Sequence, residues 1–276
     1  MRKIKLASPL FIVRDDCAKD LYGSLRRLAA IGFDGVEFLG FFGHAPSEIR
    51  KELDGCGLRA VGNHIGLDGF YANTEAVLDA HEILGCKYIN VGGISPDGMP
   101  GGSDFAGTVA KIAALAEASR RRGIVLLYHN HADELLSKTG GVDLLEALAD
   151  GVPAEDLKLE PDLGLIAIGC GDVMHYLDKY KNRFPVLHLK DFYADGAAPI
   201  DRTADFLLAR GGPDRGRFEF RPTGYGIMNY PALLEKCLAC VPEWIVADHD
   251  FAYKRDSYDD LRLSLEFLKS FLQIGA

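Results

Sequence analysis

A stretch of eight residues that begins at Tyr128 holds a high density of side chains that could do chemistry. It reads YHNHADEL and brings His129, His131 and Glu134 directly after the apolar run 124–127. Polar groups this dense do not suit the interior of a β-sheet, where each would lose its contact with water. The stretch therefore either satisfies its own hydrogen bonds as a loop or supplies nitrogen and oxygen ligands.

Other polar residues occupy the same kind of position, at the end of a short β-rich run. Glu134, Asp162, His188 and Asp248 come from the ends of the fifth to the eighth of these runs. If the runs are parallel strands of a barrel, their carboxyl ends meet at one mouth. Three carboxylates and one imidazole form an oxygen-rich ligand set that suits Mn²⁺ or Mg²⁺, with Zn²⁺, Co²⁺ and Fe²⁺ as alternatives. The pattern predicts a site for one divalent cation, with open positions for two substrate oxygens.

Three of these predicted ligands have a competing structural role. Asp162 could cap a turn or a helix, and His188, which lies between two leucines, could be a core histidine with satisfied hydrogen bonds. Glu134 could be a solvated loop residue, and His129 or His131 would then be the fifth-strand ligand.

The last two strand ends leave further choices open. Asp248 competes with Asp250 as the eighth-strand ligand, since the two residues flank His249. Lys190 and Asp191 could pair only with each other, which would leave neither of them for a substrate.

The elements that must position these residues alternate regularly along the chain. Amphipathic stretches with apolar residues at three- and four-residue spacing separate the β-rich runs, and several end in a glycine typical of a helix C-cap: Gly32, Gly57, Gly85 and Gly123. The runs are KIKLAS, GVEFLG, LRAVGNH, KYINVGG, IVLLYHN, LKLEPD, PVLHLKD and EWIVADHD. Eight strand–helix units in 276 residues predict an α/β fold, a closed (β/α)₈ TIM barrel with one domain over 1–276.

One interval breaks this alternation. No strand is predicted from Phe192 to about Met228, where the chain is rich in Gly, Pro, Asp and Arg. A long loop inside a compact domain is usually functional or disordered. On a barrel this loop, about 192–228, would follow the seventh strand and lie over the C-terminal mouth. We expect it to act as a lid or a substrate loop.

The net charge, the length of the apolar runs and the distribution of cysteines argue against several classes of function. The formal net charge of −9 and the pI near 5.4 argue against a nucleic-acid partner, which needs clustered Lys and Arg. No apolar run approaches the roughly 20 residues of a membrane span, so no membrane partner is expected. The six scattered cysteines, with Cys237 and Cys240 on one face of an apolar stretch, predict buried reduced thiols and a cytoplasmic protein.

With these motifs, the chain resembles the sugar phosphate isomerase/epimerase family, the xylose isomerase-like TIM barrels, over nearly its full length. The resemblance is carried by YHNHADEL, LEPDLGLIAIGCGD, PVLHLKDF, RPTGYGIMNYPALL and EWIVADHD. Family members commonly have HNH followed by Glu, a sixth-strand Asp, the seventh-strand HxKD motif and an eighth-strand acid. The resemblance implies a divalent cation held by Glu134, Asp162, His188 and Asp248.

The chain departs from the family pattern at two positions. The eighth-strand acid is usually Glu, and Asp248 is one methylene shorter, which affects its reach as a catalytic base more than its role as a ligand. Tyr225 stands where the family often has an acidic residue between two glycines. The family also contains dehydratases and other lyases, so membership defines the fold better than the reaction.

The expected reaction is a proton transfer next to a carbonyl, that is, isomerisation or epimerisation of a sugar or keto-sugar. A divalent ion would polarise the carbonyl and stabilise an enediolate, while Glu134 and Asp248 remove and return the proton. The residues expected to bind the substrate are Glu37, His64, His129, His131, Lys190 and Arg221.

Two other functions fit the same residues. A dehydratase or lyase acting on a keto-sugar or cyclitol begins with the same enediolate, and a sugar-binding protein without turnover needs no base. The net negative charge of the chain disfavours an endonuclease-like barrel. Because the chain has no P-loop, an unphosphorylated carbohydrate is the expected partner. The sequence is compatible with a homo-oligomer but does not indicate the oligomeric state.

Overall fold

The computed structural model describes residues 4–194, 218–240 and 242–274. Within them, all eight predicted runs form strands of one curled sheet, with every strand parallel to its neighbours except an added antiparallel strand, β10. The eight are β1 (Lys5–Pro9), β2 (Gly35–Phe38), β3 (Arg59–Gly66), β4 (Tyr88–Gly92), β5 (Val125–His129), β8 (Lys158–Glu160), β9 (Val186–Ala194) and β11 (Trp244–Asp248). Their order in the sheet is β9-β11-β1-β2-β3-β4-β5-β8.

β8 and β9 share fewer backbone-paired residues than the other neighbouring strands do. β5 pairs with β8 through three residue partners, and β9 pairs with β11 through five. Between β8 and β9, the described residues show one isolated parallel bridge, which joins Asp162 to His188, and the His188 N–H donates to the carbonyl of Pro161 at 3.0 Å. These two contacts are the backbone links that the described residues show between β8 and β9.

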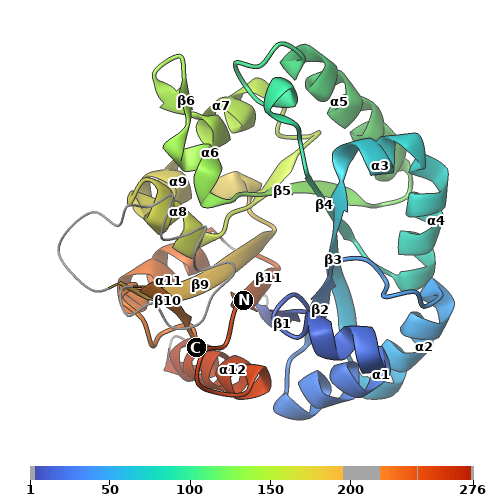
Figure 1. Ribbon diagram of the computed structural model, residues 1–276, viewed down its shortest axis with the longest axis vertical. Coiled ribbons are helices and arrows are strands. Elements are labelled where there is room, and N and C mark those ends of the chain that lie inside the picture. The colour runs from blue at the N-terminus through green and yellow to red at the C-terminus, as the bar shows by residue number, and fades with distance from the viewer. Residues whose placement is uncertain (1–3, 195–217, 241, 275–276) are drawn as a thin grey trace.

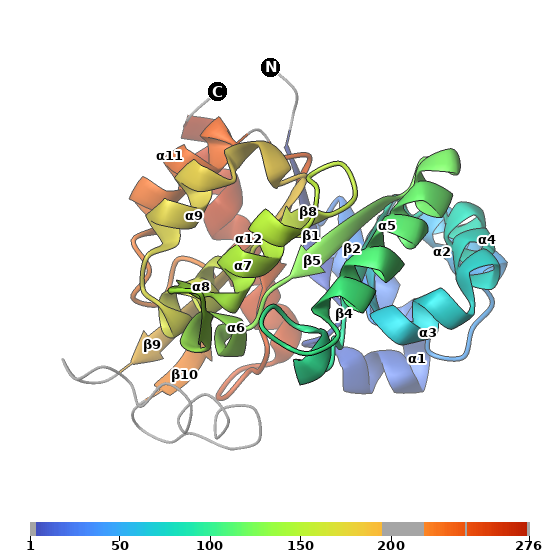
Figure 2. The same cartoon turned by 90° about the horizontal axis from the view of Figure 1, so that it is seen from above.

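Helices surround the curled sheet, as Figure 1 shows. They are α1 (Arg14–Ile31), α2 (Pro46–Cys56), α3 (Leu67–Ala72), α4 (Thr74–Leu84), α5 (Phe105–Arg121), α6 (Ala132–Leu136), α7 (Leu144–Gly151), α8 (Leu163–Gly169), α9 (Val173–Lys179), α11 (Tyr230–Ala239) and α12 (Ser257–Ile274). In Figure 2, α2 to α5 lie on one side of the strands, and α9, α11 and α12 lie on the other. Short 3₁₀ turns occur at Pro96–Gly98 and Lys181–Arg183.

Helix ends follow the capping signals in the sequence. Gly32, Gly57 and Gly85 are C-caps with φ of 104°, 74° and 72°, values that favour glycine. A glycine pair also forms the turn of a small hairpin, β6 (Lys138–Thr139) and β7 (Val142–Asp143), because Gly140 and Gly141 both have positive φ.

Two apolar cores hold the layers together. The interior of the sheet is filled by buried side chains that include Ala7, Val61, Tyr88, Leu127 and Trp244, and a larger core lies between the strands and the helices. Full burial of a Leu, Ile, Val or Phe side chain contributes roughly 1.5–3 kcal/mol. The apolar interior therefore fixes the strand ends on which the polar residues stand.

The interval 192–228 differs from its prediction. β9 continues to Ala194, and β10 (Phe218–Arg221) pairs with it in antiparallel register, with Phe220 opposite Phe192. The prediction of no strand in this interval was wrong, because Phe218, Phe220 and Phe192 pack in a small apolar cluster that buries the hairpin. Residues 195–217 of the predicted lid lie outside the described residues, so the lid remains a prediction.

The remaining sequence predictions concern cysteines and membranes. All six cysteines are free, Cys237 is buried, and Cys240 is partly buried. In the described part of the chain, no helix is long and apolar enough to cross a membrane.

Candidate metal centre

Three of the four predicted ligands come together with one residue that was predicted for substrate binding. Asp162, His188 and Asp248 form a group with His129, and each of the four offers a ligand atom within 4.8 Å of the others. All four side chains are buried, His129 the least, at 9% exposure. The Nδ1 of His188 lies 3.0 Å from Oδ2 of Asp248, and Nε2 of His129 lies 3.9 Å from Oδ2 of Asp162.

The strands explain why these side chains converge. His129 is the last residue of β5 and pairs in register with Glu160, the last residue of β8. Side chains alternate between the two faces of a strand, so residues two apart point the same way. Glu160 and Asp162 follow this spacing, and so do His188 and Lys190 on β9.

Glu134 lies outside this group. It is the third residue of α6, where its Oε2 accepts the backbone N–H of His131 at 2.8 Å and its Oε1 accepts the Tyr128 hydroxyl at 2.7 Å. Glu134 thus stabilises the start of its own helix, as acids in the first turn commonly do. The fifth-strand member of the group is His129, the alternative that the sequence left open.

Two of the predicted substrate-binding residues join a second polar group beside the first. His64, His129, Glu160 and His188 also offer ligand atoms within 4.8 Å of one another. Glu37, at the end of β2, lies 3.1 Å from Nε2 of His64 and 2.7 Å from Nε2 of His188. Gly62 makes room for this carboxylate, because a Cβ there would lie 2.8 Å from Oε1 of Glu37.

Lys190 provides the positive charge of the site. It is fully enclosed, and its Nζ lies 2.7 Å from Asp162, 3.0 Å from Asp248 and 3.0 Å from Asp250. Asp191 is not its partner. Asp191 instead accepts four backbone N–H groups, those of Phe192, Gly224, Gly226 and Met228. Lys190 and Asp191 therefore do not pair with each other.

The other predicted residues stand further from the cluster. His131 is half-exposed on the rim, and its ring centroid lies 5.4 Å from that of His129. Arg221 is on β10, where it pairs with Glu219 and its guanidinium lies 5.6 Å from the Tyr193 ring centroid. The described contacts do not bring Arg221 to the histidine–carboxylate cluster.

Two residues of the site were missed by the sequence reasoning. Glu160 was treated as part of the strand LKLEP, although its spacing of two from Asp162 was the available signal. Asn90, on β4, donates to Glu37 at 3.2 Å and to Glu160 at 2.6 Å, so one amide group holds both carboxylates. Nothing in the sequence around Asn90 marks this role.

Burial and neighbouring charges raise the pKa of two acids of the site and leave the pKa of two others lowered. Burial and the neighbouring Glu37 carboxylate raise the pKa of Glu160 to about 7, and burial raises the pKa of Asp162 to about 6 against the opposing charge of Lys190. Burial would also raise the pKa of Asp248, but Lys190 and His188 hold it well below its ordinary value. Likewise, His188 and His64 outweigh burial and hold the pKa of Glu37 well below normal.

The histidines respond to the same neighbours. Burial lowers the pKa of His188, but Glu160, Glu37 and Asp248 more than offset it, so this pKa is raised well above its ordinary value. Burial and the nearby His188 and His64 hold the pKa of His129 well below normal. A neutral imidazole at His129 is the form that can bind a metal.

The residues present fit a divalent cation. Two imidazoles and two carboxylates are ligands for Zn²⁺, Mn²⁺ and related ions. The ligand atoms of all four residues lie within 4.8 Å of one another, and Nδ1 of His188 faces Oδ2 of Asp248 at 3.0 Å. A cation at the carboxyl ends of β5, β8, β9 and β11 would therefore meet a convergent set of two nitrogens and two carboxylates.

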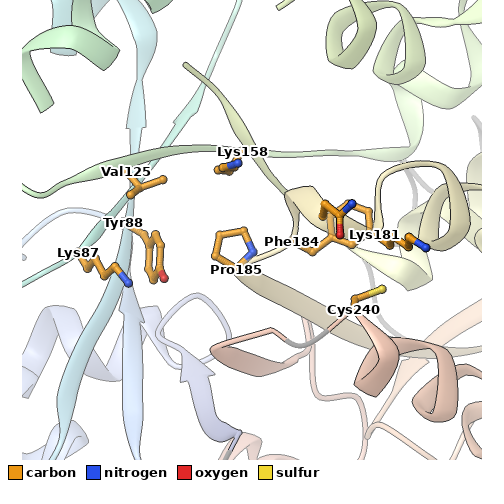
Figure 3. Close-up of a pocket in the computed structure, with 9 residues that line it drawn as sticks. Lys87, Tyr88, Val125, Lys158, Lys181, Phe184, Pro185 and Cys240 are labelled. Atoms are coloured by element: carbon orange, nitrogen blue, oxygen red, sulfur yellow. The ribbon is translucent and has the colours of Figure 1, made fainter. Parts of the chain in front are cut away.

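A separate hollow lies at the opposite ends of the strands. It measures about 360 Å³ and is lined by residues that include Lys87, Tyr88, Lys158, Lys181 and Pro185. These residues stand at or before the first residues of β4, β8 and β9, so the hollow is remote from the cluster. Figure 3 shows Lys181 pointing away from Lys87 and Tyr88, so the lysines do not form a common anion site.

Comparisons with known proteins agree on the fold. A search of curated proteins finds no match. Among solved structures, a sugar phosphate isomerase/epimerase from Parabacteroides distasonis superposes with a TM-score of 0.72 at 18% identity, covering 98% of this chain and 96% of that one. The probable 3-DHS dehydratase AsbF from Bacillus anthracis gives 0.70 at 13% identity, covering 96% and 99%.

A third structure, the IolI protein with a bound zinc atom, gives a TM-score of 0.68 at 11% identity and covers 98% of both chains. Identities this low show a common fold and nothing further about the reaction. The sequence profile of the xylose isomerase-like TIM barrels matches residues 25–269. The chain therefore belongs to the xylose isomerase-like TIM barrel family.

Proposed function

We propose that the protein is a divalent-metal-dependent isomerase or epimerase of a sugar or keto-sugar, with a closed eight-stranded barrel as its scaffold. The observation that carries the proposal is the convergence of His129, Asp162, His188 and Asp248 on one buried point. Four ligands from four strands around an open mouth are typical of catalytic metal sites in barrels. When bound there, a divalent ion would act as a Lewis acid on the carbonyl beside the reacting carbon.

Asp248 is the proposed proton acceptor. Lys190 and His188 hold its pKa well below normal, so the carboxylate is ionised at neutral pH. Its Oδ1 accepts the His249 N–H at 2.7 Å, which fixes the direction of the carboxylate. A base held in one orientation loses little entropy when it meets its proton.

His64 is the proposed proton donor on the other side. Its side chain is 35% exposed, whereas those of Glu37 and Glu160 are buried, so His64 connects these acids to the mouth. Burial lowers the pKa of His64, but Glu37 outweighs it and raises the pKa above the ordinary value. Glu134, the other predicted base, has both oxygens engaged by Tyr128 and His131, so the second transfer is assigned to His64 instead.

The substrate would be a small polar carbohydrate. The partly exposed His131 offers a donor for hydroxyl groups near the cluster, whereas the enclosed Lys190 already faces Asp162, Asp248 and Asp250.

The test is proton exchange in D₂O. Purified protein with Mn²⁺ is incubated with a panel of aldoses, ketoses and keto-sugars, and the products are followed by NMR and mass spectrometry. We expect α-proton exchange with conserved molecular formula, and loss of exchange on chelation. Loss of water from the product would favour a dehydratase instead. Binding of a sugar without exchange or product would favour a sugar-binding protein.

A further inference from the structure

The two ligand groups of the centre share two histidines. His129 and His188 belong to both groups, while Asp162 and Asp248 complete the first, and His64 and Glu160 complete the second. The proposed function places the metal ion in the first group. The second has its own set of nitrogen and oxygen atoms within 4.8 Å of one another.

Each shared imidazole presents a different nitrogen to each group. His188 turns Nδ1 to Asp248 at 3.0 Å and Nε2 to Glu160 at 3.3 Å. His129 turns Nε2 to Asp162 at 3.9 Å and Nδ1 to Glu160 at 3.5 Å. Both rings therefore stand between the groups, with one nitrogen on either side.

The second group contains buried atoms that lack hydrogen bonds. Nδ1 of His129 and Oε1 of Glu160 form none with the described residues, whereas Nε2 of His188 and Oε2 of Glu37 lie 2.7 Å from each other. Glu160 is fully buried, and Glu37 is 2% exposed. Buried polar atoms without partners are costly. A cation between these residues would remove that cost.

We propose that His64, His129, Glu160 and His188 form a second, nitrogen-rich cation position that is filled instead of the first position and never together with it. The inference rests on the proposed function, because it assumes that the first group binds an ion. A neutral imidazole has one N–H and one lone pair. Filling both positions would require His129 and His188 each to lose both ring protons.

The two positions differ in the ions they favour. Three imidazoles and one carboxylate are four ligands of the kind that Zn²⁺ prefers, whereas the two carboxylates of the first group favour Mn²⁺ and Mg²⁺. Lys190 also lies 2.7 Å from Asp162 and 3.0 Å from Asp248, so an ion in the first position shares both carboxylates with an ammonium. No Lys or Arg among the described residues contacts Glu37 or Glu160.

The position of the ion determines the tautomer of each shared histidine. An ion in the first position takes Nδ1 of His188 and leaves the Nε2–H facing Glu160 at 3.3 Å, beside Glu37 at 2.7 Å. An ion in the second position takes Nε2 and leaves the Nδ1–H facing Asp248. The carboxylates of one position thus orient the histidines of the other, in the manner of outer partners at known metal sites.

The experiment reads this tautomer directly. Full-length protein with ¹⁵N-labelled histidine is freed of metal, given one equivalent of ZnCl₂, and studied by long-range ¹H–¹⁵N NMR. We expect zinc on Nε2 of His64, Nδ1 of His129 and Nε2 of His188. His64→Gln should lower zinc affinity by at least about tenfold and leave Mn²⁺ affinity unchanged. The matched control is His175→Gln, in exposed α9, which should change neither affinity.

Three results would overturn the inference, and they separate it from the proposed function. Zinc on Nδ1 of His188 with His64 unbound would reject the second position and keep the first. Binding of Mn²⁺ without any binding of zinc would do the same. Failure of the wild type to bind either ion would reject both the second position and the metal-dependent function.

Discussion

The backbone N–H of Gly226 donates to Oδ2 of Asp191 at 2.9 Å, and a Cβ at Gly226 would lie 2.1 Å from Oδ1 of the same carboxylate. Asp191 thus closes the turn after β10 onto β9, next to the candidate site. The carboxylate accepts four backbone N–H groups in total, so it replaces the strand or helix hydrogen bonds that this turn lacks.

Asp191→Ala should lower the free energy of unfolding by about 2–4 kcal/mol, because several buried N–H groups lose their acceptor. Urea unfolding followed by circular dichroism measures this change. Asp133→Ala, at an exposed position of α6, is the control and should change stability by less than about 0.5 kcal/mol. Equal effects in the two variants would contradict the role of Asp191.

Asp162→Asn should lower metal occupancy, because it removes a charged ligand from the first group. Asp162 also caps α8, where its Oδ1 accepts the Leu165 N–H at 2.9 Å, and asparagine preserves a cap. Asp172→Asn is a matched control, since Asp172 caps α9 in the same way on the exposed surface. Elemental analysis should show loss of metal in the first variant alone, and full occupancy in both would remove Asp162 from the ligand set.

Asp248→Asn should abolish proton exchange at the substrate α-carbon and weaken metal binding. Asp248→Glu adds one methylene and should retain the metal with measurable exchange, although a shift of about 1 Å can cost roughly a hundredfold in rate. Exchange in D₂O, measured by NMR for both variants, is the readout. Wild-type exchange in Asp248→Asn would exclude this residue as the base.

Lys190→Met should destabilise the metal-free protein by about 3–5 kcal/mol, because it leaves buried Asp162 and Asp248 without their cation. Lys111→Met is the control: it breaks the exposed pair between Lys111 and Asp68, which contributes about 0.2–1 kcal/mol. Thermal unfolding of both variants in the presence of a chelator measures the difference. A Lys190→Met protein as stable as the control would mean that the buried acids are protonated instead.

The stability contributed by Asp260 should depend on pH. Burial raises the pKa of Asp260, but hydrogen bonds from His249 and Arg255 outweigh it and hold the pKa below normal. The contribution is therefore fully present above the unfolded pKa of about 3.9 and is lost as the pH falls through the lower folded value. In urea unfolding, the deficit of Asp260→Asn should be constant from about pH 7 to 5 and shrink below about pH 4. Asp259→Asn, its exposed neighbour, should show a small deficit throughout.

The strands of this fold could be predicted because local sequence defines them. Each β-rich run is bounded by polar or glycine residues and separated from the next by an amphipathic stretch, and all eight runs form strands. β10 was missed because its pairing with β9 depends on contacts between aromatic residues far apart in sequence. The single bridge between the ends of β8 and β9 likewise depends on how the whole sheet curls, which no single run of residues encodes.

Part of the candidate site could be predicted because local sequence defines the strands that carry it. His188 and Asp248 lie within β9 and β11, and Asp162 is two residues beyond the end of β8, so the strands determine their direction. Glu134 follows a loop, and its hydrogen bonds to Tyr128 and the His131 N–H turn it toward its own helix. Glu160 required knowledge of the strand register, which pairs it with His129 across β5 and β8.

The bridge between Asp162 and His188 places two proposed ligands at the junction of β8 and β9, where the sheet has the fewest backbone pairs. A cation held by both side chains would cross-link this junction. Metal binding would then stabilise the barrel as well as complete the site, so the metal-bound form would have the most firmly closed barrel.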